Sequence, residues 1–527
     1  MKAPVPSERC SLHALVGGAV YLGEGCVIDP GYVIFRGARI EEVGALSAFT
    51  RKPDIEVLEV EGKLVLPGLV DSHLHLVGYA KSLVEPNLAD TRSLDEGLEI
   101  IRSRAARMPK GAWLTGRGWD KQRWGLTEFP TRWALDRVSP DNPVSLRSRD
   151  GHLVWVNSAA LSEAGLAEKA LRVEGGEVAV DGSGCPTGIL KENAANLLEL
   201  RTDRAETWIL DAVRQACEKL VGFGLTGVHT IEGAADARVL TGAVEAGWVP
   251  LNLFRMREVL EPDEIDPLEP SREIACIKTY ADGALGSQTA SMLEPYCGQP
   301  ANSGIAVASR QKLLDIVLSA LAKGFAVAVH AIGDRANMDI LDVYEEVRRN
   351  GRYGDALLRV EHAQVLRPED MPRFGHLGVI ASMQPVHLVS DRAVAEHYWG
   401  ARSGNAYAWK RIITGGGRVA FGSDAPIESP DPLRGIHAAA TRCDPAEPEM
   451  GPWYSAERLE VWQAMDCYTA GGAAARGALP EGGRIEVGAR SDFTILDRNV
   501  FASRDPDSIL DTRVICTIIG GQVRFYA

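Results

Sequence analysis

The sequence predicts an α/β protein built on a (β/α)8 TIM barrel, with a β-sandwich domain made from both termini and an inserted lid-like domain after the first barrel strand. Three observations support this prediction. Apolar runs typical of buried strands alternate with helical patterns through the middle of the chain. Short apolar runs separated by Gly and Asp occupy both ends. The gap after the first barrel strand is far longer than one connection needs.

Both ends of the chain carry the pattern of short strands joined by tight turns. Residues 12–65 alternate brief apolar runs with glycine and aspartate, which is typical of strands with turns between them. Near the C-terminus, the apolar run 514–519 is followed by Gly520-Gly521, which favours a two-residue hairpin. We therefore assign residues 1–65 and 480–527 to one β-sandwich domain.

The middle of the chain predicts eight barrel strands with helices between them. Residues 312–323 have apolar side chains at helical spacing, and Gly324 can end that helix. We assign residues 66–80 and 201–479 to the barrel. The eight strand candidates are 64–70, 226–231, 251–254, 275–280, 325–330, 357–362, 379–383 and 419–424.

Residues 81–200 are too long for one barrel connection, and we assign them to an insertion. Five of the eleven tryptophans fall between Trp113 and Trp155. Long insertions of this kind usually form lids or binding loops. We therefore expect the insertion to lie over the mouth of the barrel.

Composition excludes several classes of protein. The formal net charge is -14, which argues against a nucleic-acid partner, because such proteins carry a basic surface. The nine cysteines include no Cys-x-x-Cys pair, which favours reduced thiols. No apolar run is long enough to span a membrane. We expect a cytoplasmic protein with a small-molecule substrate and no nucleic-acid or membrane partner, and we leave a homodimer open.

Several ligand-type side chains end apolar runs. His73 and His75 are two residues apart, so on a strand they point to the same side. The C-terminal ends of barrel strands converge on one face, and imidazole with carboxylate suits Zn2+ or a similar divalent ion. The predicted metal ligands are His73, His75, Lys278, His330, His362 and Asp424.

Six segments resemble one known family. They are Pro67–His75, Ile277–Ser287, His330–Asn337, Glu361–Gln364, Gly422–Pro426 and Ile485–Phe493. Together they resemble the amidohydrolase superfamily, and in particular its YtcJ-like members, which include N-substituted formamide deformylases. The resemblance implies that His73, His75 and Asp424 bind one metal ion and that His330 and His362 bind a second. It also implies that Lys278, when carboxylated, bridges the two.

Lys278 allows more than one interpretation. A free ammonium group beside two dications would be repelled, so the lysine must be neutral, displaced or converted into an anionic carbamate. We favour the carbamate. The alternatives are a one-metal site with an unmodified lysine and an ordinary cation that binds substrate.

These residues predict a metal-dependent hydrolase that cleaves a non-peptide C–N bond. The most plausible substrate is an N-substituted amide or formamide, attacked by metal-activated hydroxide. Asp424 would act as general base and then as general acid. One alternative is a deaminase of an amino-substituted heterocycle that uses a single metal. A second is a regulatory relative that has lost catalysis.

Six further residues are predicted to contact the substrate. Trp119 lies between Gly118 and Asp120, which suggests a turn that presents an aromatic ring, and aromatic groups commonly line small-molecule pockets. We expect it to select an apolar N-substituent, although it could instead belong to the core of the insertion. The full set of candidates is Trp119, His152, Asp282, Arg335, Gln384 and His387.

Overall fold

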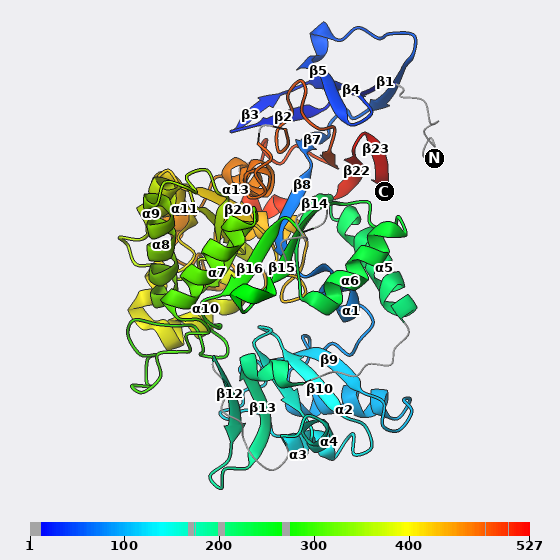
Figure 1. Ribbon diagram of the computed structural model, residues 1–527. Helices are drawn as coiled ribbons and strands as arrows, with labels where there is room; N and C mark the ends of the chain where they lie inside the picture. Colours follow the sequence, from blue (N-terminus) through cyan, green and yellow to red (C-terminus); the bar gives the residue numbers. More distant parts are fainter. Residues whose placement is uncertain are drawn as a thin grey trace.

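The computed structural model describes residues 12–166, 173, 175–198, 206–265, 274–479, 481–503 and 505–527. Three regions follow one another along the molecule (Figure 1). Strands from both chain ends lie at one end, the barrel lies in the middle and the insertion lies at the other end. The predicted domain boundaries at residues 200, 201 and 480 fall outside the described residues, so the exact limits stay predictions.

The central sheet has eight parallel strands in sequence order. Its two edge strands meet, because the Asp424 amide donates to the His73 carbonyl at 2.7 Å and the His75 amide donates to the Ala425 carbonyl at 2.8 Å. The predicted α/β barrel is therefore confirmed. The strands are β8 (Leu69–Leu74), β14 (Leu225–Glu232), β15 (Asn252–Glu258), β16 (Cys276–Tyr280), β17 (Ala326–Ala331), β18 (Leu358–His362), β19 (Ile380–Met383) and β20 (Arg418–Phe421).

Helices cover the outside of the barrel (Figure 1). The helix predicted at 312–323 is α7, which begins two residues earlier because the Ser309 hydroxyl accepts from the Lys312 amide and caps it. Gly324 follows with φ +85°, a conformation that glycine adopts readily. The helices are α1 (Leu76–Ser82), α5 (Glu206–Gly222), α6 (Ala234–Glu245), α7 (Arg310–Ala322), α8 (Asp334–Arg349), α9 (Met371–Leu377), α10 (Pro385–Trp399), α11 (Trp409–Thr414), α12 (Pro432–Thr441), α13 (Val461–Tyr468) and α14 (Ala470–Ala474).

Both termini contribute to a pair of sheets, as predicted. One sheet has the order β5-β4-β1-β6 and the other β23-β22-β21-β7-β2-β3. Gly520 and Gly521 join β22 to β23 in the expected hairpin. The strands are β1 (Leu12–Val16), β2 (Ala19–Gly23), β3 (Cys26–Ile28), β4 (Gly31–Arg36), β5 (Arg39–Ala45), β6 (Ile55–Glu59), β7 (Leu64–Pro67), β21 (Phe493–Leu496), β22 (Val514–Ile519) and β23 (Gln522–Tyr526).

The prediction of one barrel strand at 64–70 is wrong, because this segment contains two strands in different sheets. β7 pairs with β21 in the terminal sheet, whereas β8 pairs with β14 in the barrel. Gly68 separates them, and a Cβ atom there would lie 2.2 Å from the Thr226 hydroxyl, so only glycine fits. A strand of the sandwich therefore continues directly into the barrel strand that carries His73.

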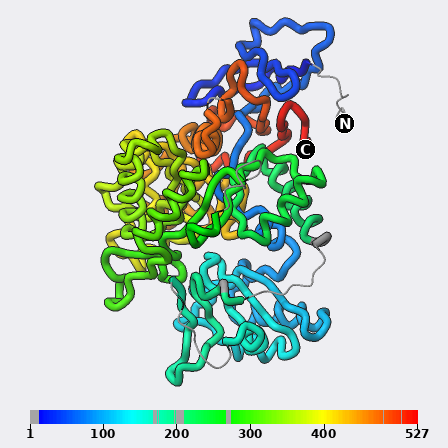
Figure 2. Tube along the Cα trace, in the orientation of Figure 1, coloured from blue at the N-terminus to red at the C-terminus, as the bar shows by residue number. Residues whose placement is uncertain are grey.

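The insertion has a five-stranded sheet and a hydrophobic core of its own. It lies beyond the opposite end of the barrel from the two chain termini (Figure 2). Among the described residues, no helix is long and apolar enough to cross a bilayer. The elements of the insertion are α2 (Leu94–Ala105), β9 (Leu114–Trp119), α3 (Arg132–Asp136), β10 (Val144–Ser148), β11 (Leu153–Val156), α4 (Ser158–Glu163), β12 (Gly176–Val180) and β13 (Pro186–Glu192).

Candidate metal and active site

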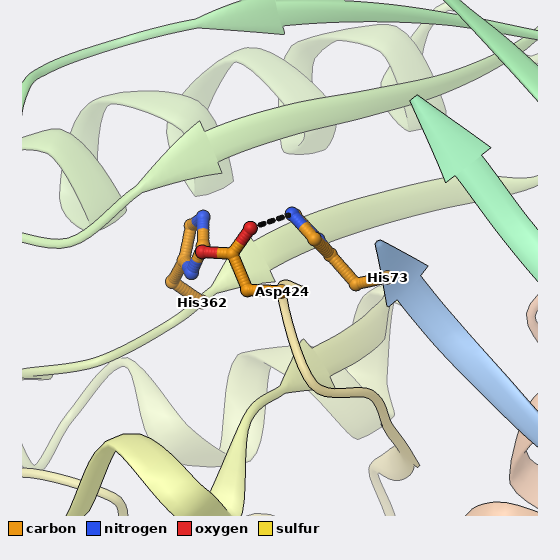
Figure 3. A group of neighbouring side chains, drawn as sticks. All are labelled: His73, His362 and Asp424. Atoms are coloured by element: carbon orange, nitrogen blue, oxygen red, sulfur yellow. Dashed lines mark ion pairs between the residues drawn. The ribbon is translucent and has the colours of Figure 1, made fainter. Parts of the chain in front are cut away.

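Three predicted ligands form a compact group at the end of the barrel. His73 in β8, His362 at the end of β18 and Asp424 after β20 each offer one ligand atom, and these atoms lie within 4.8 Å of one another (Figure 3). His73 Nε2 lies 3.4 Å from Asp424 Oδ1, and His75 Nε2 lies at the same distance from that oxygen. The three histidine side chains therefore converge on the Asp424 carboxylate.

His330 and Lys278 lie next to this group. The ring centroid of His330, in β17, is 4.5 Å from that of His362. Lys278, in β16, is fully buried, and its Nζ lies 3.8 Å from the centre of the Tyr280 ring. A neighbouring aromatic face stabilises a buried ammonium group. The structure thus brings His330 close to the compact group and leaves the Lys278 amine on an aromatic ring.

Each histidine of the group has one ring nitrogen tied to an acceptor. This arrangement fixes the ring and leaves the other nitrogen with a free lone pair, as metal-binding histidines require. The donor set therefore fits a divalent metal ion. The four pairs are His73 Nδ1 with Glu361 Oε2 at 2.5 Å, His75 Nδ1 with Ile231 O at 3.0 Å, His330 Nε2 with Gly283 O at 3.1 Å, and His362 Nδ1 with Gln384 Oε1 at 2.8 Å.

The protonation states of Asp424 and His73 depend on each other. Burial favours neutral Asp424, but His73 and His75 outweigh it and hold the pKa of that carboxyl well below its usual range. Burial likewise opposes a charged His73, but Asp424 and Glu361 raise its pKa. Asp424 is therefore an anion at neutral pH, which suits both a metal ligand and a proton acceptor.

Burial lowers the pKa of Lys278 to about 8, and Glu361 and Glu258 oppose the shift. A substantial fraction of this amine is therefore neutral near pH 8, whereas an exposed lysine is almost fully charged there. Only the neutral amine can react with carbon dioxide to form a carbamate.

The backbone is strained at two of the ligands. His362 has φ 72° and Asp424 has φ 59°, and Ala363 between the strand and its loop has φ 44°. Residues other than glycine avoid this region, and such strain concentrates at functional sites. This backbone conformation turns His362 and Asp424 away from the regular direction of their strands.

Sequence reasoning missed the residues that hold the ligands in place. The Arg359 guanidinium donates to Glu361 at 2.8 Å and to the Ser72 carbonyl at 2.7 Å, and Glu361 in turn accepts from His73. Asp71 accepts from the Ser423 hydroxyl at 2.5 Å. The sequence feature that could have identified these residues is a charged residue within an otherwise apolar strand, because a buried charge must be paired.

A pocket above the ligands is lined by both the barrel and the insertion. His152 lies in it and pairs with Glu192 at 2.8 Å, while its ring centroid is 5.1 Å from that of His330. His387, in the first turn of α10, places Nε2 3.7 Å from Asp424 Oδ2. That nitrogen is buried and has no hydrogen-bond partner among the described residues. Two of the predicted substrate contacts therefore face the site.

The other predicted substrate contacts occupy different surroundings. Gln384 is not among the residues that line the pocket, and its side-chain oxygen instead holds His362 Nδ1 at 2.8 Å. Asp282 is fully buried and accepts from the amides of Ser291 and Gly333, each at 2.8 Å. Arg335 donates to the carbonyl of Met292 at 3.2 Å. Asp282 Oδ1 also lies 3.6 Å from His330 Nε2, so Asp282 contacts a predicted metal ligand, whereas Arg335 has backbone partners in a nearby loop.

Trp119 touches the pocket but belongs mainly to the core of the insertion. Its side chain is 1% exposed, and its indole nitrogen donates to the Leu146 carbonyl at 2.8 Å. Its ring packs against Trp124 and Trp155, with centroids 6.5 and 6.0 Å away. Most of its surface is therefore committed to packing, while one edge lines the pocket.

The fold and the ligand group together define a metal-dependent hydrolase of the (β/α)8 type. The model of the amidohydrolase family matches residues 56–525, and the chain belongs to that family. YtcJ of Bacillus subtilis is 34% identical over 96% of this chain and 98% of its own length. The N-substituted formamide deformylase of Arthrobacter pascens is 29% identical over 94% of each chain.

Two solved structures share the architecture. An uncharacterized metal-dependent hydrolase from Pyrococcus furiosus has 28% identity and a TM-score of 0.70, and covers 94% of this chain and 99% of its own. Another from Pyrococcus horikoshii has 26% identity and a TM-score of 0.73, with the same coverage. These comparisons confirm the family resemblance inferred from the sequence.

Proposed function

We propose that this protein hydrolyses the C–N bond of a small N-substituted amide or formamide. The observation that carries the proposal is the convergence of four histidines and Asp424, with one ring nitrogen of each histidine held by an acceptor and the second nitrogen of His73 and His75 directed at Asp424. The similarity to an N-substituted formamide deformylase supports this choice of substrate class. The products would be a carboxylic acid, formate in the simplest case, and a free amine.

We further propose Zn2+ as the metal, held at two positions. His73, His75 and Asp424 would hold one ion, His330 and His362 the other, and a carboxylated Lys278 both. Bound metal supplies a Lewis acid that lowers the pKa of water and polarises a carbonyl group. Imidazole and carboxylate ligands support zinc over magnesium or calcium, which prefer all-oxygen sites.

Two residues would move or hold protons. Asp424 accepts a proton from the attacking water and returns it to the leaving nitrogen, so that the departing group is a neutral amine. His387 Nε2, 3.7 Å from the second oxygen of Asp424, is placed to donate to the substrate carbonyl oxygen as negative charge develops there. That nitrogen is within ion-pair distance of Asp424 but has no hydrogen-bond partner among the described residues, which supports this role.

The experiment is a hydrolysis screen on protein loaded with zinc or manganese. Release of equal amounts of amine and formate from N-substituted formamides would support the proposal, with Asp424→Asn protein as the control. Release of ammonia from aminated heterocycles would favour a single-metal deaminase instead. No turnover in fully loaded protein would favour a non-catalytic relative.

We also propose that the protein works in the cytoplasm on a small molecule, without nucleic acid or a membrane. The net charge of -14 supports the absence of a nucleic-acid partner. Light scattering on the purified protein would decide between a monomer and a homodimer.

A further inference from the structure

A second, smaller cavity lies at the other end of the barrel from the candidate metal site. Gly68 and Thr226, at the starts of β8 and β14, form one wall, and His229, Arg476 and Arg490 face it. Its volume is about 30 Å³, enough for a water molecule or an ion of similar size, since such a site needs at least about 10–15 Å³. None of the proposed catalytic residues lines it.

His229 presents an unsatisfied donor to this cavity. The Arg359 guanidinium donates to His229 Nδ1 at 2.9 Å. A guanidinium group can only donate, so Nδ1 is unprotonated and the single proton of the neutral ring is on Nε2. Burial, reinforced by Arg359 and Arg476, lowers the pKa of His229 and keeps the ring neutral. Nε2 is buried and has no hydrogen-bond partner among the described residues.

The cations around the cavity are not all neutralised. Arg484 pairs with Glu24, and Arg490 pairs with Asp492 at 2.9 Å. The Arg476 guanidinium faces the cavity and has no hydrogen bond or ion pair with the part of the chain that the structure describes, although Asp492 and Glu481 are near enough to stabilise its charge. One positive charge is therefore left beside the buried N–H of His229.

The neighbouring carboxylate cannot easily turn to Arg476. Both oxygens of Asp492 already accept, from Arg490, from the Asn252 amide group at 2.9 Å and from the Gly520 backbone amide at 2.6 Å. Rotating this carboxylate would break bonds that hold the sandwich to the barrel, and a buried group left unpaired in this way is costly.

An acceptor placed between His229 and Arg476 would satisfy the buried His229 donor and also contact the Arg476 guanidinium, which is partly exposed. A neutral water could accept from both, but a guanidinium that no carboxylate pairs directly favours an anion. We propose that this cavity binds a small monatomic anion, chloride in size, between His229 Nε2 and the Arg476 guanidinium. The ion would join the start of the barrel to the loop that leads into the sandwich.

Diffraction from wild-type crystals soaked in bromide tests the position directly. The expected result is an anomalous peak within hydrogen-bond distance of both His229 Nε2 and the Arg476 guanidinium. A water molecule with no anomalous signal at that place would overturn the proposal. This measurement needs no variant, so it decides the question even if changes at Arg476 impair folding.

Thermal unfolding supplies an independent test in solution. A ligand that binds only the folded state raises the melting temperature in a saturable way. We expect the wild type to gain stability in sodium chloride relative to sodium gluconate of the same ionic strength, because gluconate is too large for the cavity. Arg476→Gln should lose this gain, whereas Arg418→Gln, at an exposed position, should keep it. An equal response in wild type and Arg476→Gln would contradict the proposal.

Discussion

The floor and the roof of the active-site pocket are built on different principles. The floor consists of residues at the ends of barrel strands, and each histidine there is oriented by a separate hydrogen bond. The roof belongs to the insertion, where Trp119 packs mainly against other aromatic rings of its own domain. The side chains of the floor are therefore positioned to bind metal and substrate, whereas the side chains of the roof mainly stabilise the insertion.

This difference separates two kinds of substitution. A change in the floor removes a group that contacts metal or substrate and leaves most packing intact. A change in the roof removes packing first and affects catalysis only through the position of residues such as His152.

Replacing His73 with Ala should abolish turnover and lower the bound metal, because His73 lies at the centre of the ligand group. His330→Ala and His362→Ala should do the same if the site holds two ions. Metal analysis and activity assays check this, with circular dichroism to show that the fold persists. His397→Ala, at an exposed position, is the matched control. Full activity of His330→Ala would remove that residue from the site.

Asp424→Asn keeps the shape of the side chain but removes the proton acceptor. We expect kcat to fall by about 10²- to 10⁴-fold, the usual loss when general acid–base catalysis is removed. The measurement is kcat on protein whose metal content has been matched to the wild type. Near-normal turnover of the metal-loaded variant would contradict the assigned role.

Lys278→Ala should lose the metal at the second position and most of the activity. A short carboxylic acid such as propionate fits the space that a carbamate would occupy, so adding it should restore part of the activity. Lys278→Met gives a variant of similar size for comparison. An unmodified lysine in the density of an active, metal-replete enzyme would instead favour the one-metal interpretation.

Formation of the carbamate should depend on pH through Lys278. The folded-state pKa is lowered to about 8, so about half of the amine is neutral at pH 8, and the reactive neutral form increases up to about pH 9 and changes little above that. After removal of metal and carbon dioxide, reactivation by added metal and bicarbonate should therefore quicken over that range. Reactivation that slows as the pH approaches 8, at constant dissolved carbon dioxide, would argue against a carbamate.

Trp119→Ala should have the smallest effect on chemistry and a large effect on stability. Deleting a buried aromatic ring typically costs about 3–5 kcal/mol of unfolding free energy. If the edge that lines the pocket also contacts substrate, KM should rise more for aryl amides than for small alkyl amides. Denaturant unfolding and KM for both series separate the two roles. Equal KM changes would show that Trp119 serves packing alone.

The residues of the floor could be predicted from the sequence, because the end of a barrel strand can be recognised from the residues next to it in the chain. Apolar runs that end in His330, His362 or Asp424 place those side chains on the same face of any parallel barrel. The roles of Arg335 and Asp282 could not be predicted, since their partners are backbone groups in irregular loops. Glu361 and Arg359 lie within a barrel strand and hold His73 in place. This role can be recognised only from their hydrogen-bond partners in the structure.

The division of 64–70 into two strands was also beyond the sequence. Within 64–70, the residues that belong to β7 and the first two residues of β8 are all apolar, so local propensity does not distinguish them. They differ only in their neighbours, and the partner of β7 is β21, more than four hundred residues later in the chain. Pairing over such distances depends on the whole fold.

The continuity of β7 with β8 sets an order of events during synthesis. His73 and His75 leave the ribosome early, but the strand that leads into theirs pairs with Phe493–Leu496, and their own strand end meets Ala425. A nascent chain that stops before these segments has the histidines without the frame that aligns them. Although domains generally fold as they emerge, N-terminal first, we expect this protein to become able to capture metal only when nearly the whole chain has been made.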